Sequence, residues 1–223
     1  MKKPKPLIQL LIYPWTQMYT FSNPSFIYYN QKDFIANSKI PIGRYMLWLL
    51  GIKDNITEEM ENVFSSDNHT LLLSDKNLRK RYESNLDIGL VPAKYKAGKV
   101  YYDANISKNV NLNKLDASNI LFKNKELANK IKILFTDQAN PGLVSDELLK
   151  RLPKAYFLIV EWDSLKDQGL IYAERLKSNG VSVKIAYYEN AYHGMVPFIH
   201  PASGYNLART MFEDVVNFIN LNV

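Results

Sequence analysis

The chain is long enough for one folded domain, and its composition excludes several classes of protein. Its 223 residues are 47% hydrophobic and 22% charged, which is typical of a folded globular protein and excludes global disorder. The formal net charge is +6, but the basic residues are spread along the chain, without the basic runs interleaved with aromatics that nucleic-acid binding needs. The absence of cysteine excludes disulfides, thiolate metal sites and a cysteine nucleophile.

The N-terminal segment predicts a buried β-strand. Lysines precede an apolar run over residues 7–13, an order that superficially resembles a signal peptide. The run is shorter than the roughly 20 residues of a membrane span, contains Gln9, runs into Pro14 and lacks a small-residue cleavage site. We therefore expect a strand here, within a core segment of residues 7–16.

Residues 17–141 predict a long helical insertion, or cap, and not a separate domain. Short helical patterns at 41–50 and 78–84 lie among polar, Asn-rich stretches without strand alternation. Glu58 and Glu59 suit the solvated first turn of a further helix. An aromatic and apolar set is open to two interpretations, an acyl or aryl substrate pocket or ordinary core: Tyr28, Tyr29, Tyr45, Met46, Trp48 and Leu49.

Residues 142–223 predict a β-α-β unit and a final helix. The runs 155–161 and 181–188 are rich in β-branched and aromatic residues, as strands are. Between them, Leu170, Ala173 and Leu176 have helical spacing, and Asn179-Gly180 is a helix stop. A β-α-β unit implies a parallel sheet. After a loop over 189–201, one apolar stripe marks the last helix: Ala208, Met211, Phe212, Val215 and Ile219.

Two polar residues follow the two predicted strands of this unit. Asp163 comes just after the first strand and His193 comes soon after the second. Because the carboxyl ends of parallel strands share one edge of the sheet, we expect the two side chains to meet, with the acid orienting the imidazole. Each has a simpler interpretation, Asp163 as a helix N-cap and His193 as a loop histidine without a role. Their order and spacing favour the paired interpretation.

The same residues carry a family resemblance. The stretches Glu161-Trp162-Asp163-Ser164-Leu165-Lys166-Asp167 and Tyr188-Glu189-Asn190-Ala191-Tyr192-His193-Gly194, with Leu11-Ile12-Tyr13-Pro14 upstream, resemble the hormone-sensitive-lipase branch of the α/β hydrolases, and within it the arylacetamide deacetylase group. The resemblance implies a parallel sheet flanked by helices with a helical cap, and a serine-triad hydrolase of apolar esters or arylamides. It implies Asp163 as the acid and His193 as the base, no cofactor, and a lumenal endoplasmic-reticulum location. Three sequons agree with that compartment, at Asn55, Asn68 and Asn105.

The family's nucleophile is not found in this chain. There is no Gly-x-Ser-x-Gly elbow and no His-Gly-Gly-Gly loop, and Ser164 and Ser203 lack an elbow context. Since the nucleophile precedes acid and histidine in this fold, we expect the chain to begin just after it, to be inactive alone, and to expose strand 7–13 as a sheet edge. A membrane anchor upstream is possible.

The alternative to a hydrolase is a non-catalytic protein derived from one, which binds a partner chain. His69 and His200 lack partners at metal-ligand spacing, so we expect no metal site.

Overall fold

The computed structural model describes residues 5–30, 42–96 and 119–223. Its centre is a three-stranded parallel sheet in the order β1 (Ile8–Ile12), β2 (Lys154–Trp162) and β3 (Val183–Tyr192). Each of the three predicted strands is confirmed. Residues 155–160 of β2 are buried, and strands pair with β2 on both sides, whereas β1 pairs with β2 alone within the described sheet.

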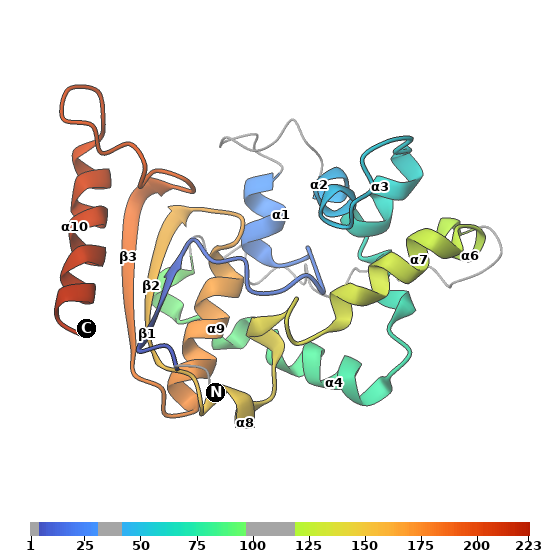
Figure 1. Cartoon of the computed structure of the whole chain (residues 1–223), viewed down its shortest axis with the longest axis horizontal. Helices are drawn as coiled ribbons and strands as arrows, with labels where there is room; N and C mark the ends of the chain where they lie inside the picture. The colour runs from blue at the N-terminus through green and yellow to red at the C-terminus, as the bar shows by residue number, and fades with distance from the viewer. Residues whose placement is uncertain (1–4, 31–41, 97–118) are drawn as a thin grey trace.

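Two helices cover the two faces of the sheet. Side chains along β2 point alternately to one face and to the other. Helix α9 (Lys166–Ser178) lies on one face, and α10 (Asn206–Asn220) lies on the other (Figure 1). The odd-numbered residues from Ala155 to Ile159 pack with α9, and the even-numbered residues from Tyr156 to Val160 pack with α10. This three-layer arrangement is that of an α/β protein with a buried parallel sheet.

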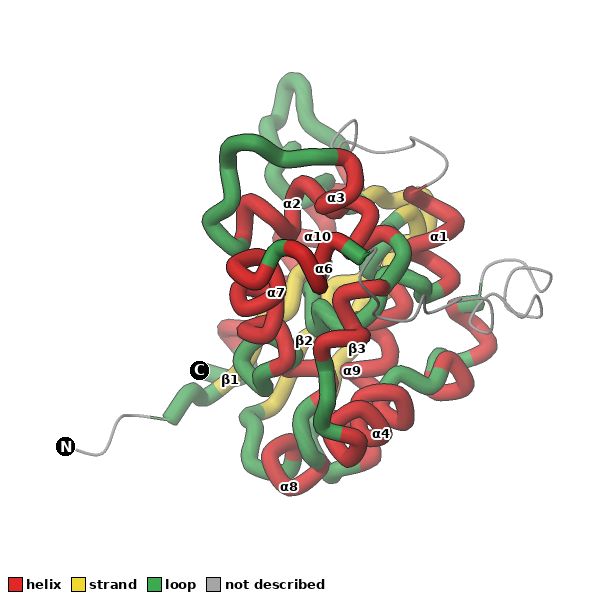
Figure 2. The backbone as a smooth tube through the Cα atoms, turned by 90° about the vertical axis from the view of Figure 1, so that its right-hand side faces the viewer, coloured by secondary structure: helices red, strands yellow, loops and turns green. Residues whose placement is uncertain are grey.

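Between β1 and β2, the described residues form short helices joined by loops and turns, without a strand. Its elements are α1 (Pro24–Asn30), α2 (Ile42–Leu49), α3 (Glu58–Ser65), η1 (Asn68–Leu72), α4 (Lys76–Asn85), η2 (Ile88–Leu90), η3 (Ala93–Tyr95), α6 (Ile120–Lys123), α7 (Lys125–Ile131), η5 (Lys132–Phe135), η6 (Pro141–Leu143) and α8 (Asp146–Leu149). Both short helices expected in the cap are present, as α2 and α4. Figure 2 shows the red helices α2, α3, α6 and α7 gathered beside the sheet.

Part of the helical region has its own apolar core, and other residues from it, such as Val91, Tyr95 and Leu149, pack with α9 and the sheet. Side chains of α2, α3 and α7 pack together around Met46, Phe64 and Leu127. Helix α3 begins at Glu58 behind a capping Thr57, and Glu58 and Glu59 are exposed as expected. No helix among the described residues has both the length and the apolar character needed to cross a membrane.

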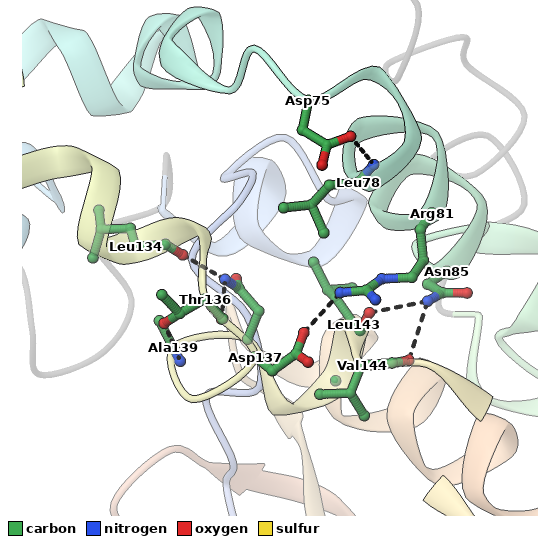
Figure 3. A network of polar contacts seen from close by, with 12 residues as sticks. Asp75, Leu78, Arg81, Asn85, Leu134, Thr136, Asp137, Ala139, Leu143 and Val144 are labelled. Atoms are coloured by element: carbon green, nitrogen blue, oxygen red, sulfur yellow. Dashed lines mark hydrogen bonds and ion pairs between the residues drawn. The ribbon is translucent and has the colours of Figure 1, made fainter. Parts of the chain in front are cut away.

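One polar network joins α4 to the segment that leads into β2 (Figure 3). Arg81 forms an ion pair of 2.7 Å with Asp137, and the amide of Asn85 donates to the carbonyl oxygen of Leu143 at 3.1 Å. On the other side of that segment, Arg175 of α9 donates to the carbonyl oxygens of Gly142 and Val144 at 2.6 and 2.8 Å. The segment after α7 is therefore held from both sides.

Candidate functional site

Asp163 follows β2 and starts the turn into α9. Its Oδ1 accepts a hydrogen bond from the backbone N of Leu165 at 2.8 Å, and its carbonyl oxygen accepts one from Lys166 N at 3.2 Å. Oδ1 thus closes an Asx turn just ahead of α9, whereas the N-cap residue of that helix is Leu165, so the N-cap interpretation of Asp163 is wrong. The other oxygen, Oδ2, is turned to a different partner.

That partner is His193, which follows β3. Its Nδ1 lies 3.1 Å from Oδ2 of Asp163, and its backbone N donates to the carbonyl oxygen of Trp162 at 3.2 Å. The Asp163 side chain is 2% exposed and the imidazole 31% exposed. Because a carboxylate can only accept, the proton of a neutral imidazole belongs on Nδ1, and Nε2 keeps its lone pair. No hydrogen bond from the described residues occupies Nε2.

An irregularity in β3 brings the two residues into register. Val160 pairs with Tyr188, but Trp162 pairs with Tyr192, so a step of two residues on β2 (162 − 160) matches a step of four on β3 (192 − 188). Without these two extra residues, Asp163 would face residue 191. With them, the residues that follow Trp162 and Tyr192 stand opposite each other.

The bulge also corrects one sequence prediction. We expected a loop from 189, whereas β3 continues to Tyr192. Asn190 adopts a left-handed φ of 56°, and its backbone N donates to Oε2 of Glu161 at 2.8 Å. Asparagine tolerates this conformation, which allows the chain to bulge and then resume pairing. The polar pair Glu189-Asn190 is typical of a loop, and sequence alone does not separate a loop from a bulge.

Two opposing effects set the pKa of His193. Burial of the ring lowers the pKa, and the hydrogen bond to Asp163 and the charge of its carboxylate raise it. The effects of Asp163 together prevail, so the pKa is raised above its usual value. The imidazole of His193 therefore binds a proton more tightly than a histidine side chain free in water.

A tyrosine that the sequence analysis did not single out lies against the imidazole. The ring centroids of Tyr13 and His193 are 5.1 Å apart, with an angle of 45° between the planes. Tyr13 directly follows β1 and lies about 180 positions before His193 in the sequence, so no local pattern connects the two. The one available signal is its place just beyond a strand end and before Pro14.

The residues predicted for a substrate pocket lie on two helices of the cap. Tyr45 and Trp48 form a ring pair 6.2 Å apart on α2, 48% and 40% exposed, and Tyr28 of α1 packs edge-on against Tyr29 at 5.0 Å. Met46 is fully buried, as the core interpretation requires. The substrate pocket therefore stays a prediction.

The predicted glycan acceptors differ in accessibility. Asn55 is exposed in the loop before α3, with a left-handed φ of 53°. Asn68 is half-buried in η1, its Oδ1 is enclosed, and the hydroxyl of Thr70 is used in a hydrogen bond to Asp67 O. Asn105 lies outside the described residues. Within the described ranges there is no cluster of three metal-ligating side chains.

Comparison with known proteins agrees with this architecture. A family model described as "alpha/beta hydrolase fold" matches residues 108–197. Arylacetamide deacetylase of Bos taurus is 27% identical over 218 residues, 97% of this chain and 47% of that protein. Neutral cholesterol ester hydrolase 1 of the same species is 26% identical over 221 residues, 99% of this chain and 48% of that protein.

A solved structure is similar as well. Carboxyl esterase 2 of Tuber melanosporum superposes with a TM-score of 0.45 at 18% sequence identity, over 96% of this chain and 44% of that one. The chain spans about half the length of the curated relatives it matches. The predicted resemblance is confirmed: the chain has the α/β-hydrolase fold and is similar in sequence to arylacetamide deacetylase and neutral cholesterol ester hydrolase 1.

Proposed function

We propose that Asp163 and His193 are the acid and the general base of a serine-type hydrolase of carboxylic esters or amides. The observation that carries the proposal is the 3.1 Å contact between Oδ2 of Asp163 and Nδ1 of His193, beside an Nε2 that no described residue occupies. A buried carboxylate behind a more exposed imidazole is the arrangement that a triad requires on the base side.

The chemistry follows from that arrangement. A serine hydroxyl attacks the substrate carbonyl carbon, and Nε2 accepts the hydroxyl proton. Asp163 stabilises the imidazolium, which then gives its proton to the departing alkoxide or amine. Water attacks the acyl-serine by the same route, and the free acid leaves. The serine and the oxyanion donors are not assigned within this chain, so we propose that they come from protein outside these 223 residues.

The relatives narrow the proposed substrates. Their names specify an arylacetamide and a cholesterol ester, both amides or esters with large apolar groups. We propose apolar acyl or aryl substrates here, with Tyr28, Tyr45 and Trp48 along the approach to the site. We also propose a lumenal endoplasmic-reticulum location with Asn55 as a glycan acceptor, membrane association through a segment outside the chain, and no cofactor.

The test compares this chain with a longer form. The reading frame upstream of Met1 should be expressed to the length of the relatives and assayed on p-nitrophenyl esters of increasing acyl length. We expect turnover that falls about 10⁴-fold in D163N and at least as far in H193A. Full turnover in H193A would overturn the proposal. We expect the 223-residue chain not to react with a fluorophosphonate probe. Labelling that H193A abolishes would place the nucleophile inside it.

One observation favours a second candidate, a non-catalytic binding protein. Strand β1 is paired on one side within the described sheet, and Leu10 and Ile12 on it are 37% and 38% exposed. An edge of this kind is a template for a strand from another chain. This candidate predicts that the longer form has no esterase activity and that a stable complex survives size-exclusion chromatography. Active monomer would exclude it.

A further inference from the structure

Tyr13 contacts the surroundings of His193 in three ways. Its backbone is bonded to β2, its ring lies against the imidazole, and its hydroxyl group is bonded to the turn after His193. We propose that Tyr13 is a positioning residue that fixes the turn carrying the imidazole. The inference rests on the proposed role of His193 as a base, and it concerns how that base is held and not whether turnover occurs.

The backbone of Tyr13 places its side chain on the face of the sheet where the His193 turn lies. In a regular strand, residue 13 would point to the same face as Leu11, which packs with the α9 cluster. Tyr13 instead packs in the α10 cluster, together with Tyr192 and Val196. Its φ of 48° lies in the left-handed region that side chains other than Gly, Asn and Asp rarely adopt. The residue is kept in the sheet by its backbone N, which donates to Leu158 O at 3.0 Å.

Such a conformation persists where surrounding contacts impose it, and the hydroxyl of Tyr13 supplies two of them. The oxygen accepts a hydrogen bond from the backbone N of Val196 at 2.8 Å, three residues after His193. The hydroxyl hydrogen points to Sδ of Met211 in α10 at an O–S distance of 3.9 Å. Burial raises the pKa of Tyr13 to about 12, so the hydroxyl keeps its proton at neutral pH and serves both partners.

These contacts hold the imidazole from a second side. Asp163 engages Nδ1, and the Tyr13 ring lies against the imidazole with the centroids 5.1 Å apart. The turn between His193 and Val196 includes Gly194, whose φ of 86° is available to glycine with little strain. Because glycine is conformationally free, this turn keeps a single geometry only if a contact from outside the turn fixes it. The hydrogen bond between Val196 N and the Tyr13 hydroxyl is such a contact.

The test removes the hydroxyl alone. Y13F keeps the ring but leaves Val196 N without its acceptor. The matched control is Y19F, because the Tyr19 hydroxyl is also bonded in a buried setting, to Glu83 at 3.3 Å, and its pKa is also raised to about 12 by burial. Both variants of the 223-residue chain should be titrated by NMR on the His193 ring protons.

We expect Y13F to lower the pKa of His193, because a looser turn weakens the bond to Asp163 and leaves burial less opposed. Y19F should leave that pKa unchanged. A Y13F titration that coincides with wild type overturns the inference. If Y13F does not fold, hydrogen exchange of the Val196 backbone amide in the wild-type chain is the test. Exchange as fast as that of an unprotected amide overturns the inference, and slow exchange supports it.

The kinetic constants of the protein expressed from the longer reading frame provide an independent test. There, Y13F should lower kcat about tenfold with little change in KM, since small misplacements of a catalytic group cost up to about 100-fold. If the longer form proves inactive while Y13F still shifts the His193 titration, the proposed function fails and the positioning inference stands.

Discussion

Replacement of Asp163 by asparagine isolates the contribution of one carboxylate charge. An asparagine Oδ1 can still accept from Leu165 N, as Asp163 does at 2.8 Å, so the turn into α9 is kept. What changes is the bond to His193, which is largely shielded from water because the two side chains are 2% and 31% exposed. A hydrogen bond to a charged group contributes about 1.5–3 kcal/mol to stability, against about 0.5–1.5 kcal/mol for a neutral one.

The effect on the free energy of unfolding depends on pH. Burial lowers the pKa of His193, but the bond and charge of Asp163 raise it above its unfolded value of about 6.5. Protonation therefore stabilises the fold, fully below about pH 6.5, and this stabilisation is lost as the pH rises through the folded pKa. In D163N, burial acts unopposed and protonation favours unfolding. We expect D163N to lower the free energy of unfolding by about 1.5–3 kcal/mol near pH 5.5 and by about 1 kcal/mol or less near pH 8.5.

Urea unfolding followed by circular dichroism at the two pH values measures this difference. The control is D87N, because Oδ1 of Asp87 also accepts from a backbone N two residues on, Gly89 at 2.8 Å, and makes no contact with a histidine within the described chain. D87N should change stability equally at both pH values. If D163N also loses the same free energy at both, the charge of Asp163 does not act through His193 and the reasoning is wrong.

Three further predictions concern the fold. Leu158→Ala, at a fully buried position in the central strand, should cost about 2–5 kcal/mol in urea unfolding, whereas Leu148→Ala, at a position 41% exposed, should cost far less. Gly43→Ala should destabilise the chain although alanine favours helices, because the added Cβ would lie 2.1 Å from the carbonyl oxygen of Glu61, and a neutral or higher melting temperature would contradict that packing. Leu10→Lys should leave stability within about 0.5 kcal/mol and reduce self-association by analytical ultracentrifugation, since charge on an edge strand blocks pairing.

Much of the frame around the site follows from local sequence patterns. The apolar runs at 7–13, 155–161 and 181–188 are strands because β-branched and aromatic residues pack on a pleated sheet. The helix between the last two runs ends at Ser178, with Asn179 as its C-cap, and the following Gly180 has a φ of 81°. These features depend on nearest neighbours and short periodicities, which a single sequence contains.

Other features depend on contacts between distant segments. The first turn of α9 is buried although it reads as polar: Gln168 Oε1 accepts from Thr16 N at 2.7 Å, and Asp167 Oδ2 accepts from Ser25 N at 2.7 Å. Gln168 and Asp167 are each paired with a residue more than a hundred positions away, so composition does not reveal their burial.

The sequence by itself determined the α/β class, the order of the strands along the chain, and the pair Asp163 and His193 at successive strand ends. Only the tertiary structure decided that the two side chains meet. The meeting depends on a bulge at Asn190 that adds two residues to β3, and we propose that Tyr13, directly after β1, fixes the turn that carries His193. Register and cross-sheet contact are set by packing across long sequence distances, and no local propensity encodes them.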